Sequence, residues 1–134
     1  MNDHPAHDRH LALKVVMMPR DTNMYGTIFG GVILSYIDQA GAVGAYHEIR
    51  HAGFTKKPLV TVGVKSVEFH RPVFVGDVLS FWTKLLRLGK TSITIQVVVE
   101  AERDGQLEKL TEAEVTYVAV AFKGDSRIPV PIQD

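Results

Sequence analysis

Residues 30–52, GGVILSYIDQAGAVGAYHEIRHA, decide the fold, because apolar or small side chains fall on every side of a helix built from them. Asp38 is the only charged residue in this stretch before Glu48, so the pattern predicts a helix that is buried nearly all round. At about 1.5 Å per residue the helix would be about 33 Å long, the width of a small domain. Gly41 and Gly44 lower the helix propensity but let other backbone approach closely, so we expect a sheet that wraps tightly around the helix.

The sequence on both sides of the helix predicts antiparallel strands. An apolar run at residues 11–18 comes first and ends at Pro19, and a long loop then leads to the helix. From Leu59 the pattern changes to period two with many β-branched residues. Strands are expected at about residues 59–69, with a β-bulge near residues 65–66, and then at about 78–88, 93–100 and 113–119. Turns that contain glycine separate them at residues 76–77, 89–90 and 104–105.

One apolar helix followed by a meander of strands can be buried only if the sheet curls around it. The sequence therefore predicts an α+β protein with the hotdog fold, in which one long central helix is wrapped by a curved antiparallel sheet of about five strands. Such a sheet keeps open edges and covers the helix incompletely, so we expect pairing with a second copy. A single domain is expected at residues 11–123, with a flexible solvated arm at residues 1–10 and a tail at residues 124–134.

Composition narrows the classes of function. Fifteen Lys and Arg residues balance fifteen Asp and Glu residues, which argues against binding to nucleic acid or to an anionic membrane. The absence of cysteine excludes disulfides, Cys-ligated zinc and a thiol nucleophile. No segment approaches the roughly 20 apolar residues of a membrane span, and the N-terminal residues lack the apolar run of a signal peptide. We therefore expect a soluble, cytoplasmic protein.

Three segments carry a resemblance to a known family. They are DTNMYGTIFGGVILSYID at residues 21–38, FHRPVFVGD at residues 69–77 and GKTS at residues 89–92. Together they resemble the acyl-CoA thioesterases of the hotdog superfamily, in particular the short bacterial acyl-CoA thioester hydrolases of the YciA type. The resemblance implies hydrolysis of an acyl-CoA thioester to a carboxylic acid and CoA, with Asp38 and Asn23 as the polar working groups. It also implies that no cofactor is needed and that dimers assemble further into a hexamer.

The residues themselves support these roles. A carboxylate in the middle of an otherwise uncharged helix is costly unless it is used or paired, so Asp38 is the candidate general base or nucleophile. Gly30 and Gly31 place unpaired N–H groups at the start of the helix, where the oxyanion of a thioester could bind. Asn23 would orient water or hold the carbonyl. Asp38 lies seven residues beyond Gly31, about 10 Å along the helix, so we expect these groups to converge only between two chains related by a two-fold axis.

For each of these residues the sequence also allows a purely structural role. Asp38 could be held by a neighbouring hydroxyl such as that of Tyr36 or Thr61. Asn23 could form an Asx-turn after Pro19. The glycine pair could serve only the close packing of the helix. These alternatives stay open at the level of the sequence.

Candidate contacts to CoA are Arg71, Lys90, Thr91 and Ser92. A basic side chain close to a glycine turn with free N–H donors is suited to phosphate groups. The alternative is that these four are ordinary solvated surface residues.

Several histidines suggest metal sites that we do not expect. Residues 47–51, HEIRH, match the zinc protease motif H-E-x-x-H. The motif falls in the last turn of the predicted helix, where the helix dipole favours histidine, and no suitable third ligand follows it. His4, His7 and His10 of the arm would bind metal only adventitiously. His70 is expected to lie in a turn or to contact ligand rather than to act as a base.

Two other functions are compatible with a hotdog fold. The first is a non-enzymatic acyl-CoA sensor, but this sequence contains no helix-turn-helix segment with which a regulator would contact DNA. The second is a dehydratase of 3-hydroxyacyl thioesters, which resembles the thioesterases in fold but carries a histidine near the start of the helix. No histidine occurs between Leu11 and Tyr46. Both observations favour the hydrolase.

Overall fold

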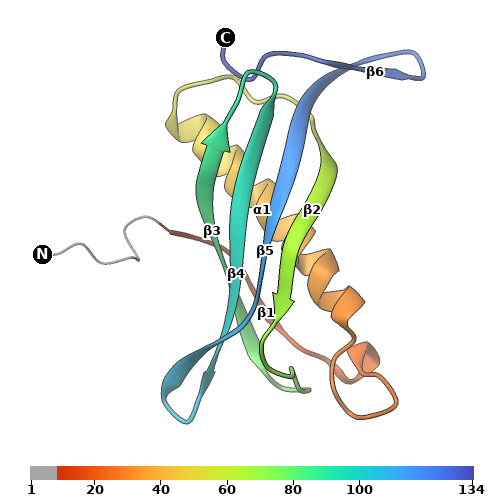
Figure 1. The fold of residues 1–134 in the computed structure, drawn as a ribbon, viewed down its shortest axis with the longest axis vertical. Coiled ribbons are helices and arrows are strands. Elements are labelled where there is room, and N and C mark those ends of the chain that lie inside the picture. The colour runs from red at the N-terminus through yellow and green to blue at the C-terminus, as the bar shows by residue number, and fades with distance from the viewer. Residues whose placement is uncertain (1–8) are drawn as a thin grey trace, which may run out of the picture.

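The structure, a computed structural model, describes residues 9–134, and its elements follow the predicted order (Figure 1). Residues 1–8, which include most of the predicted arm with His4 and His7, lie outside the described residues. The first half contains strand β1 (His10–Val16), the 3-10 helix η2 (Pro19–Asp21) and helix α1 (Gly30–His51). The second half contains β2 (Leu59–Phe69), β3 (Val78–Leu88), β4 (Ser92–Arg103), β5 (Gln106–Lys123) and β6 (Ser126–Pro129).

The strands form one curved antiparallel sheet with α1 against one face (Figure 1). The strand order is β1-β3-β4-β5-β2, and β6 pairs with the end of β5. Strands β1 and β2 are therefore the two edges of the main sheet. This arrangement matches the predicted architecture of one central helix wrapped by a meander.

The core lies between α1 and the two central strands. Alternate residues of β4 and β5 face the helix and are buried, as the period of two predicts. Helix α1 contributes its own buried stripe to the same core. The fully buried side chains of the two strands include Ile93, Ile95, Val97, Val99, Ala113, Val115, Tyr117 and Ala119.

The helix approaches the sheet most closely at two glycines. A Cβ atom on Gly44 would lie 2.6 Å from the Cβ atom of Thr83 on β3, and a Cβ atom on Gly41 would meet the hydroxyl of Tyr117 on β5. That hydroxyl donates a hydrogen bond of 2.6 Å to the backbone carbonyl of Asp38. Burial raises the pKa of Tyr117 well above its usual range, and the nearby Asp38 adds to the effect. The predicted close packing of the helix is therefore confirmed at these positions.

Two predicted irregularities of the strands are also confirmed. The pairing of β2 with β5 shifts register between Lys65 and Glu68, and Ser66 has a φ of 56°. Such a shift with one residue in the left-handed region is a β-bulge. Asp104 and Gly105 have φ values of 53° and 78°, which is the conformation of a tight hairpin turn with two residues at positive φ.

The helix is not buried all round, which differs from the prediction. One side of α1 is exposed, and Val43 on that side keeps 40% of its surface accessible. Edge strand β2 is exposed as well, with Val62 at 59%. The reason is that a single sheet covers only one side of a helix, so the other side depends on a further partner.

Two segments for which the sequence predicts no regular structure belong to strands. His10 belongs to the predicted arm, but it begins β1 because its backbone pairs with Thr83 and its ring stacks on His47. Residues after Phe122 show no periodicity, yet they form β6, and Ile132 beyond it is buried. A four-residue strand that ends in proline is too short for its period to be recognised. No helix within residues 9–134 is long and apolar enough to cross a membrane.

The substitution Gly44→Ala tests the close contact. Alanine favours a helix over glycine by about 1 kcal/mol, but the added methyl group would overlap Thr83, so we expect a net loss of about 1–3 kcal/mol of stability. The measurement is the midpoint of urea unfolding. Gly31→Ala is the control, because its Cβ atom would meet nothing within 4 Å, and its midpoint should not fall. Equal stability of Gly44→Ala and the wild type would show that the contact is not tight.

Candidate active site

Asp38 lies in the middle of α1, on the side that faces β2. The hydroxyl of Thr61 on β2 donates a hydrogen bond of 2.7 Å to its Oδ1 atom. Oδ2 has no hydrogen-bond partner within the described part of the chain, and no Lys, Arg or His there forms an ion pair with this carboxylate. Asp38 is half-buried. The site therefore presents one oriented, partly desolvated carboxylate oxygen that is free to accept a proton.

Of the two hydroxyls that could hold Asp38, the structure selects one. Thr61 makes the contact, whereas the ring of Tyr36 packs against Phe81 at a centroid distance of 5.9 Å. Thr61 and Tyr117 are paired across β2 and β5. One cross-strand pair thus holds both the carboxylate and the backbone carbonyl of Asp38.

The start of α1 offers two unpaired amides. Phe29 is the N-cap residue and its side chain makes no capping hydrogen bond, so among residues 9–134 the N–H groups of Gly30 and Gly31 have no acceptor. A Cβ atom on Gly31 would meet nothing within 4 Å, while one on Gly30 would lie 3.4 Å from the Phe69 ring. The 3.4 Å distance is an ordinary van der Waals contact, so close packing explains neither glycine. These amides can donate to an anionic oxygen.

Asn23 is held inside its own loop. Its Oδ1 atom accepts hydrogen bonds from the backbone N–H groups of Tyr25 (2.8 Å) and Thr27 (3.2 Å), and its Nδ2 atom donates to the Thr27 hydroxyl (2.7 Å). The Asx-turn alternative is therefore correct as a description of the loop. A side-chain amide has two N–H donors, and only one is used here. Asn23 can still donate one hydrogen bond to a carbonyl oxygen, and its oxygen is already engaged.

These groups do not meet within one chain. Asn23 and the two glycine amides lie at the N-terminal end of α1, and Asp38 lies about 10 Å further along the helix axis. All of them are on or beside the uncovered part of the helix. Gly31 lines a shallow hollow together with Asp21, Val32, Ser35, Tyr36 and Gln39.

The residues predicted to contact CoA lie at two separate places on the chain. Arg71 follows β2, where its backbone N–H donates to Leu110 and its guanidinium lies 3.7 Å from Glu108. Lys90, Thr91 and Ser92 form the β3–β4 hairpin at the opposite end, where Ser92 pairs with Val118. Val118 lies eight positions after Leu110 in β5, which corresponds to about 27 Å. One phosphate group cannot contact both places in one chain.

The H-E-x-x-H residues form an aromatic stack. The His47 ring lies parallel to the His10 ring at 3.8 Å, and His51 lies beside His47 at 4.7 Å. Burial lowers the pKa of His10, and the adjacent His47 lowers it further. The stack gives His47 a packing role that the sequence could not indicate, because its partner lies on β1.

His70 belongs to another polar cluster, at the end of β2. Its Nε2 atom lies 2.9 Å from Glu112, and Glu68 is close enough to share a cation with these two residues. The Lys109 ammonium lies 2.8 Å from the same Glu112 oxygen. Lys109, followed by His70, lowers the pKa of Glu112. A lysine thus already supplies positive charge to this exposed cluster.

A metal titration tests the H-E-x-x-H residues. If they form only a stack at the end of α1, adding zinc or removing it with a chelator should leave the Tm unchanged. The readout is thermal unfolding of the wild type and of His47→Ala with His51→Ala. An increase in Tm with zinc that is lost in the double variant would identify a metal site.

Comparisons with known proteins identify the family of this chain. The sequence model of the Thioesterase superfamily matches residues 25–108. The acyl-CoA thioester hydrolase YciA of Salmonella typhimurium is 42% identical over 128 residues, which is 92% of this chain and 91% of that protein. The chain belongs to the thioesterase superfamily, and the resemblance seen in the sequence is confirmed.

Solved structures support the same assignment. A hexameric hotdog fold thioesterase of Campylobacter jejuni is similar with a TM-score of 0.75 and 39% identity, over 90% of this chain and 89% of that chain. The predicted hotdog fold is therefore confirmed. An acyl-CoA hydrolase of Staphylococcus aureus, in complex with butyryl coenzyme A, has a TM-score of 0.77 and 25% identity, over 96% of this chain and 73% of that chain.

Alanine variants of the Staphylococcus aureus hydrolase are also among the similar structures. One replaces an asparagine and another replaces an aspartate. These two residues are separated in that chain by the same number of positions as Asn23 and Asp38 in this one.

Proposed function

We propose that this chain hydrolyses acyl-CoA thioesters to the carboxylic acid and CoA. The observation that carries the proposal is the Asp38 carboxylate, which is half-buried, oriented by Thr61 and without a cationic partner in the described chain, beside a helix face that this chain leaves open. A carboxylate in this setting is suited to accept a proton from water. The name of the Salmonella typhimurium relative and the butyryl coenzyme A complex of the Staphylococcus aureus enzyme support acyl-CoA as the substrate class.

The active site combines two chains. Asp38 of one chain faces the Gly30 and Gly31 amides and the Asn23 side chain of a partner that runs antiparallel across a two-fold axis. Each dimer then holds two sites, and the exposed side of α1 and the open edge β2 are covered. The hexameric Campylobacter jejuni thioesterase supports further assembly of three dimers.

Hydrolysis then follows from the positions of these groups. Asp38 takes a proton from water as the water oxygen attacks the thioester carbonyl carbon. The negative charge that develops on the carbonyl oxygen is stabilised by the glycine amides and by the free N–H of Asn23. When the C–S bond breaks, the CoA sulfur leaves as a thiolate. The protonated Asp38 then gives its proton to that sulfur. In an alternative route Asp38 attacks the carbonyl carbon itself and forms a mixed anhydride, which water then hydrolyses. This route requires the same arrangement of Asp38, Asn23 and the glycine amides.

A binding protein or a dehydratase would not require this arrangement. An acyl-CoA sensor has no need for a free carboxylate oxygen near oxyanion donors, because binding alone does not generate that charge. A dehydratase of the hotdog type would place a histidine near the start of α1, where this chain has glycine, valine and isoleucine.

The substitution Asp38→Asn tests the base. Asparagine keeps the volume and can still accept the hydrogen bond from Thr61, so the fold should be unchanged while turnover falls by about 100-fold or more. The assay is release of CoA thiol from a panel of acyl-CoAs. Asp125→Asn, in the exposed turn between β5 and β6, is the matched control and should keep full activity. Undiminished turnover of a folded Asp38→Asn protein would show that Asp38 is structural.

Mixing of two inactive variants tests the shared site. Asn23→Ala and Asp38→Ala homodimers should each be nearly inactive. A heterodimer of the two regains one intact site, because one chain keeps Asn23 and the other keeps Asp38. Random mixing in equal amounts makes half of the dimers heterodimeric, so activity should recover to about a quarter of the wild-type value. If subunit exchange is measured but activity does not recover, each site contains Asn23 and Asp38 of a single chain.

A control separates the chemistry of Asn23 from its role in the loop. Thr27→Val removes the hydrogen bond from Asn23 Nδ2 but keeps the Asn23 side chain. If Asn23 holds the carbonyl, Thr27→Val should retain much more activity than Asn23→Ala. Equal losses would assign the effect to the loop conformation alone.

A further inference from the structure

The loop that carries Asn23 is held by a second segment of the chain. Thr27 bonds both polar atoms of the Asn23 side chain, and its carbonyl accepts a hydrogen bond of 2.8 Å from the Asn23 backbone N–H. Thr27 also forms a β-bridge with Phe74, and the N–H of Ile28 donates a hydrogen bond of 2.8 Å to the carbonyl of Val73. The direction of the Asn23 amide therefore depends on the backbone around Phe74.

One carboxylate fixes the turn that contains Phe74. The Oδ2 atom of Asp77 accepts a hydrogen bond of 2.9 Å from the Phe74 backbone N–H, and the Asp77 N–H donates one of 3.1 Å to the Phe74 carbonyl. Gly76 has a φ of 90°, a conformation that this turn requires and that favours glycine. The Gly76 N–H and the Asp77 carbonyl also bond the backbone of Met17. The turn is thus closed on itself and attached to the residue that follows β1.

Arg103, at the end of β4, holds the same carboxylate. Its Nη2 atom donates hydrogen bonds to Asp77 Oδ2 and, at 2.9 Å, to the backbone carbonyl of Pro72. Its Nη1 atom lies 3.5 Å from Glu108. The guanidinium also lies 5.4 Å from the centroid of the Phe74 ring. One side chain therefore contacts both ends of the turn and the aromatic ring between them.

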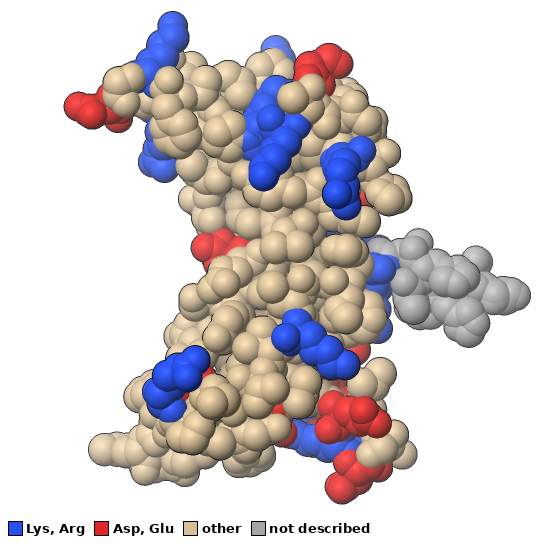
Figure 2. All heavy atoms as spheres, turned by 180° about the vertical axis from the view of Figure 1, so that it is seen from behind, with Lys and Arg blue, Asp and Glu red and all other residues tan. Residues whose placement is uncertain are grey.

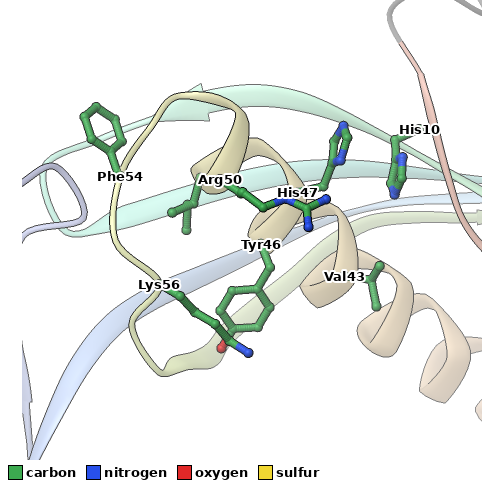
Figure 3. Close-up of a pocket in the computed structure, with 8 residues that line it drawn as sticks. His10, Val43, Tyr46, His47, Arg50, Phe54 and Lys56 are labelled. Atoms are coloured by element: carbon green, nitrogen blue, oxygen red, sulfur yellow. The ribbon is translucent and has the colours of Figure 1, made fainter.

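These contacts occupy the charge of Arg103 within the chain. Only 19% of its side chain is exposed, and it pairs with two carboxylates. Figure 2 shows acidic and basic side chains beside one another at the lower right, the end at which the β4–β5 hairpin lies in Figure 1. The opposite end of α1 holds a pocket to which Arg50 and His47 contribute (Figure 3). Arg103 thus lies at the end of the helix where the proposed oxyanion donors are.

The ion pair of Arg103 and Asp77 is better suited to orientation than to stability. Two charges that are mostly buried lose their hydration, and their attraction can be smaller than this loss. The Nε atom of Arg103 is buried and has no hydrogen-bond partner within residues 9–134, which is a further cost. A planar guanidinium that binds a carboxylate and a carbonyl together nevertheless restricts the turn to a narrow range of positions.

We propose that Arg103 and Asp77 are positioning residues of the hydrolase. Acting through the Phe74 turn and Thr27, they fix the direction in which Asn23 presents its free N–H, and they do not contact the substrate. The proposal rests on the proposed function and adds to it the support of one catalytic group. Because that N–H binds the carbonyl oxygen most strongly once negative charge develops there, its misdirection lowers kcat rather than raising KM.

The variant Arg103→Met tests this role, because methionine lacks the charge and the hydrogen bonds. We expect kcat for an acyl-CoA to fall by about tenfold or more and KM to change by less than about twofold, since small displacements of an oriented group are costly. Arg103→Lys can keep a bond to Asp77 but not the one to Pro72 as well, so its kcat should lie between those of Arg103→Met and the wild type.

A second arginine provides the matched control. The Arg9 side chain is 22% exposed, pairs with Glu100 and lies 4.2 Å from the centroid of the Trp82 ring, but it has no contact with the Phe74 turn. Arg9→Met therefore removes a similar ion pair and should keep the wild-type kcat. An equal fall in kcat of Arg9→Met and Arg103→Met would assign the effect to lost stability and overturn the proposal. A loss on Arg103→Met that appears in KM would do the same, because it would indicate direct contact with the substrate.

A double variant shows whether Arg103 acts through Asn23. In Asn23→Ala the N–H that would be oriented is gone, so adding Arg103→Met should lower the residual kcat by less than about threefold. The same loss in both backgrounds would give Arg103 a separate role and contradict the proposal. If Arg103→Met does not fold, Arg103→Lys takes its place, with an expected fall in kcat of about threefold. A wild-type kcat of Arg103→Lys would then overturn the proposal.

Hydrogen exchange separates this proposal from the proposed function. The N–H groups of Tyr25 and Thr27 donate to Asn23 Oδ1, so in Arg103→Met they should exchange at least about fivefold faster, while amides in the middle of β5 keep their rates. If exchange changes in this way but the wild type hydrolyses no thioester, the anchoring of the loop stands and the hydrolase function fails. If the wild type is active and a folded Arg103→Met keeps its kcat, the positioning role is wrong.

Discussion

The cross-strand pair of Thr61 and Tyr117 determines both where α1 lies on the sheet and where its carboxylate points. The Tyr117 hydroxyl donates to the backbone carbonyl of Asp38, and the Thr61 hydroxyl donates to the carboxylate of the same residue. The first contact requires the helix to touch β5, which is possible because Gly41 has no side chain at that point. The packing of the core and the orientation of the candidate base are therefore set by the same two hydroxyls.

This arrangement divides the helix into two sides with different roles. The side toward the sheet packs against alternating apolar residues of the strands and forms the buried core with them. The other side is uncovered, with the unpaired amides of Gly30 and Gly31 at its start and Asp38 at its border with β2. The two ends of α1 also differ, because the N-terminus carries two unpaired amides, whereas the last turn carries Arg50, which lines a pocket together with His10 and Phe54.

The sequence predicts features that depend on local periodicity and turn chemistry. The bounds of α1 and β3, the bulge at Ser66 and the turn at Asp104 all follow from neighbouring residues. Features that join distant parts of the chain are not predictable in this way. The bond from Tyr117 to Asp38 spans 79 residues, and the stack of His10 on His47 joins β1 to α1. The pocket at Arg50 is assembled from three separate elements, so no single motif indicates it.

The bulge in β2 limits how the open edge of the sheet can be extended. At Lys65–Glu68 the register shifts and Ser66 adopts a positive φ, so the edge is bent rather than flat. A bent edge that carries charged residues is a poor template for the repeated addition of strands. The bend in β2 therefore works against the growth of this exposed edge into a fibre by repeated addition of strands.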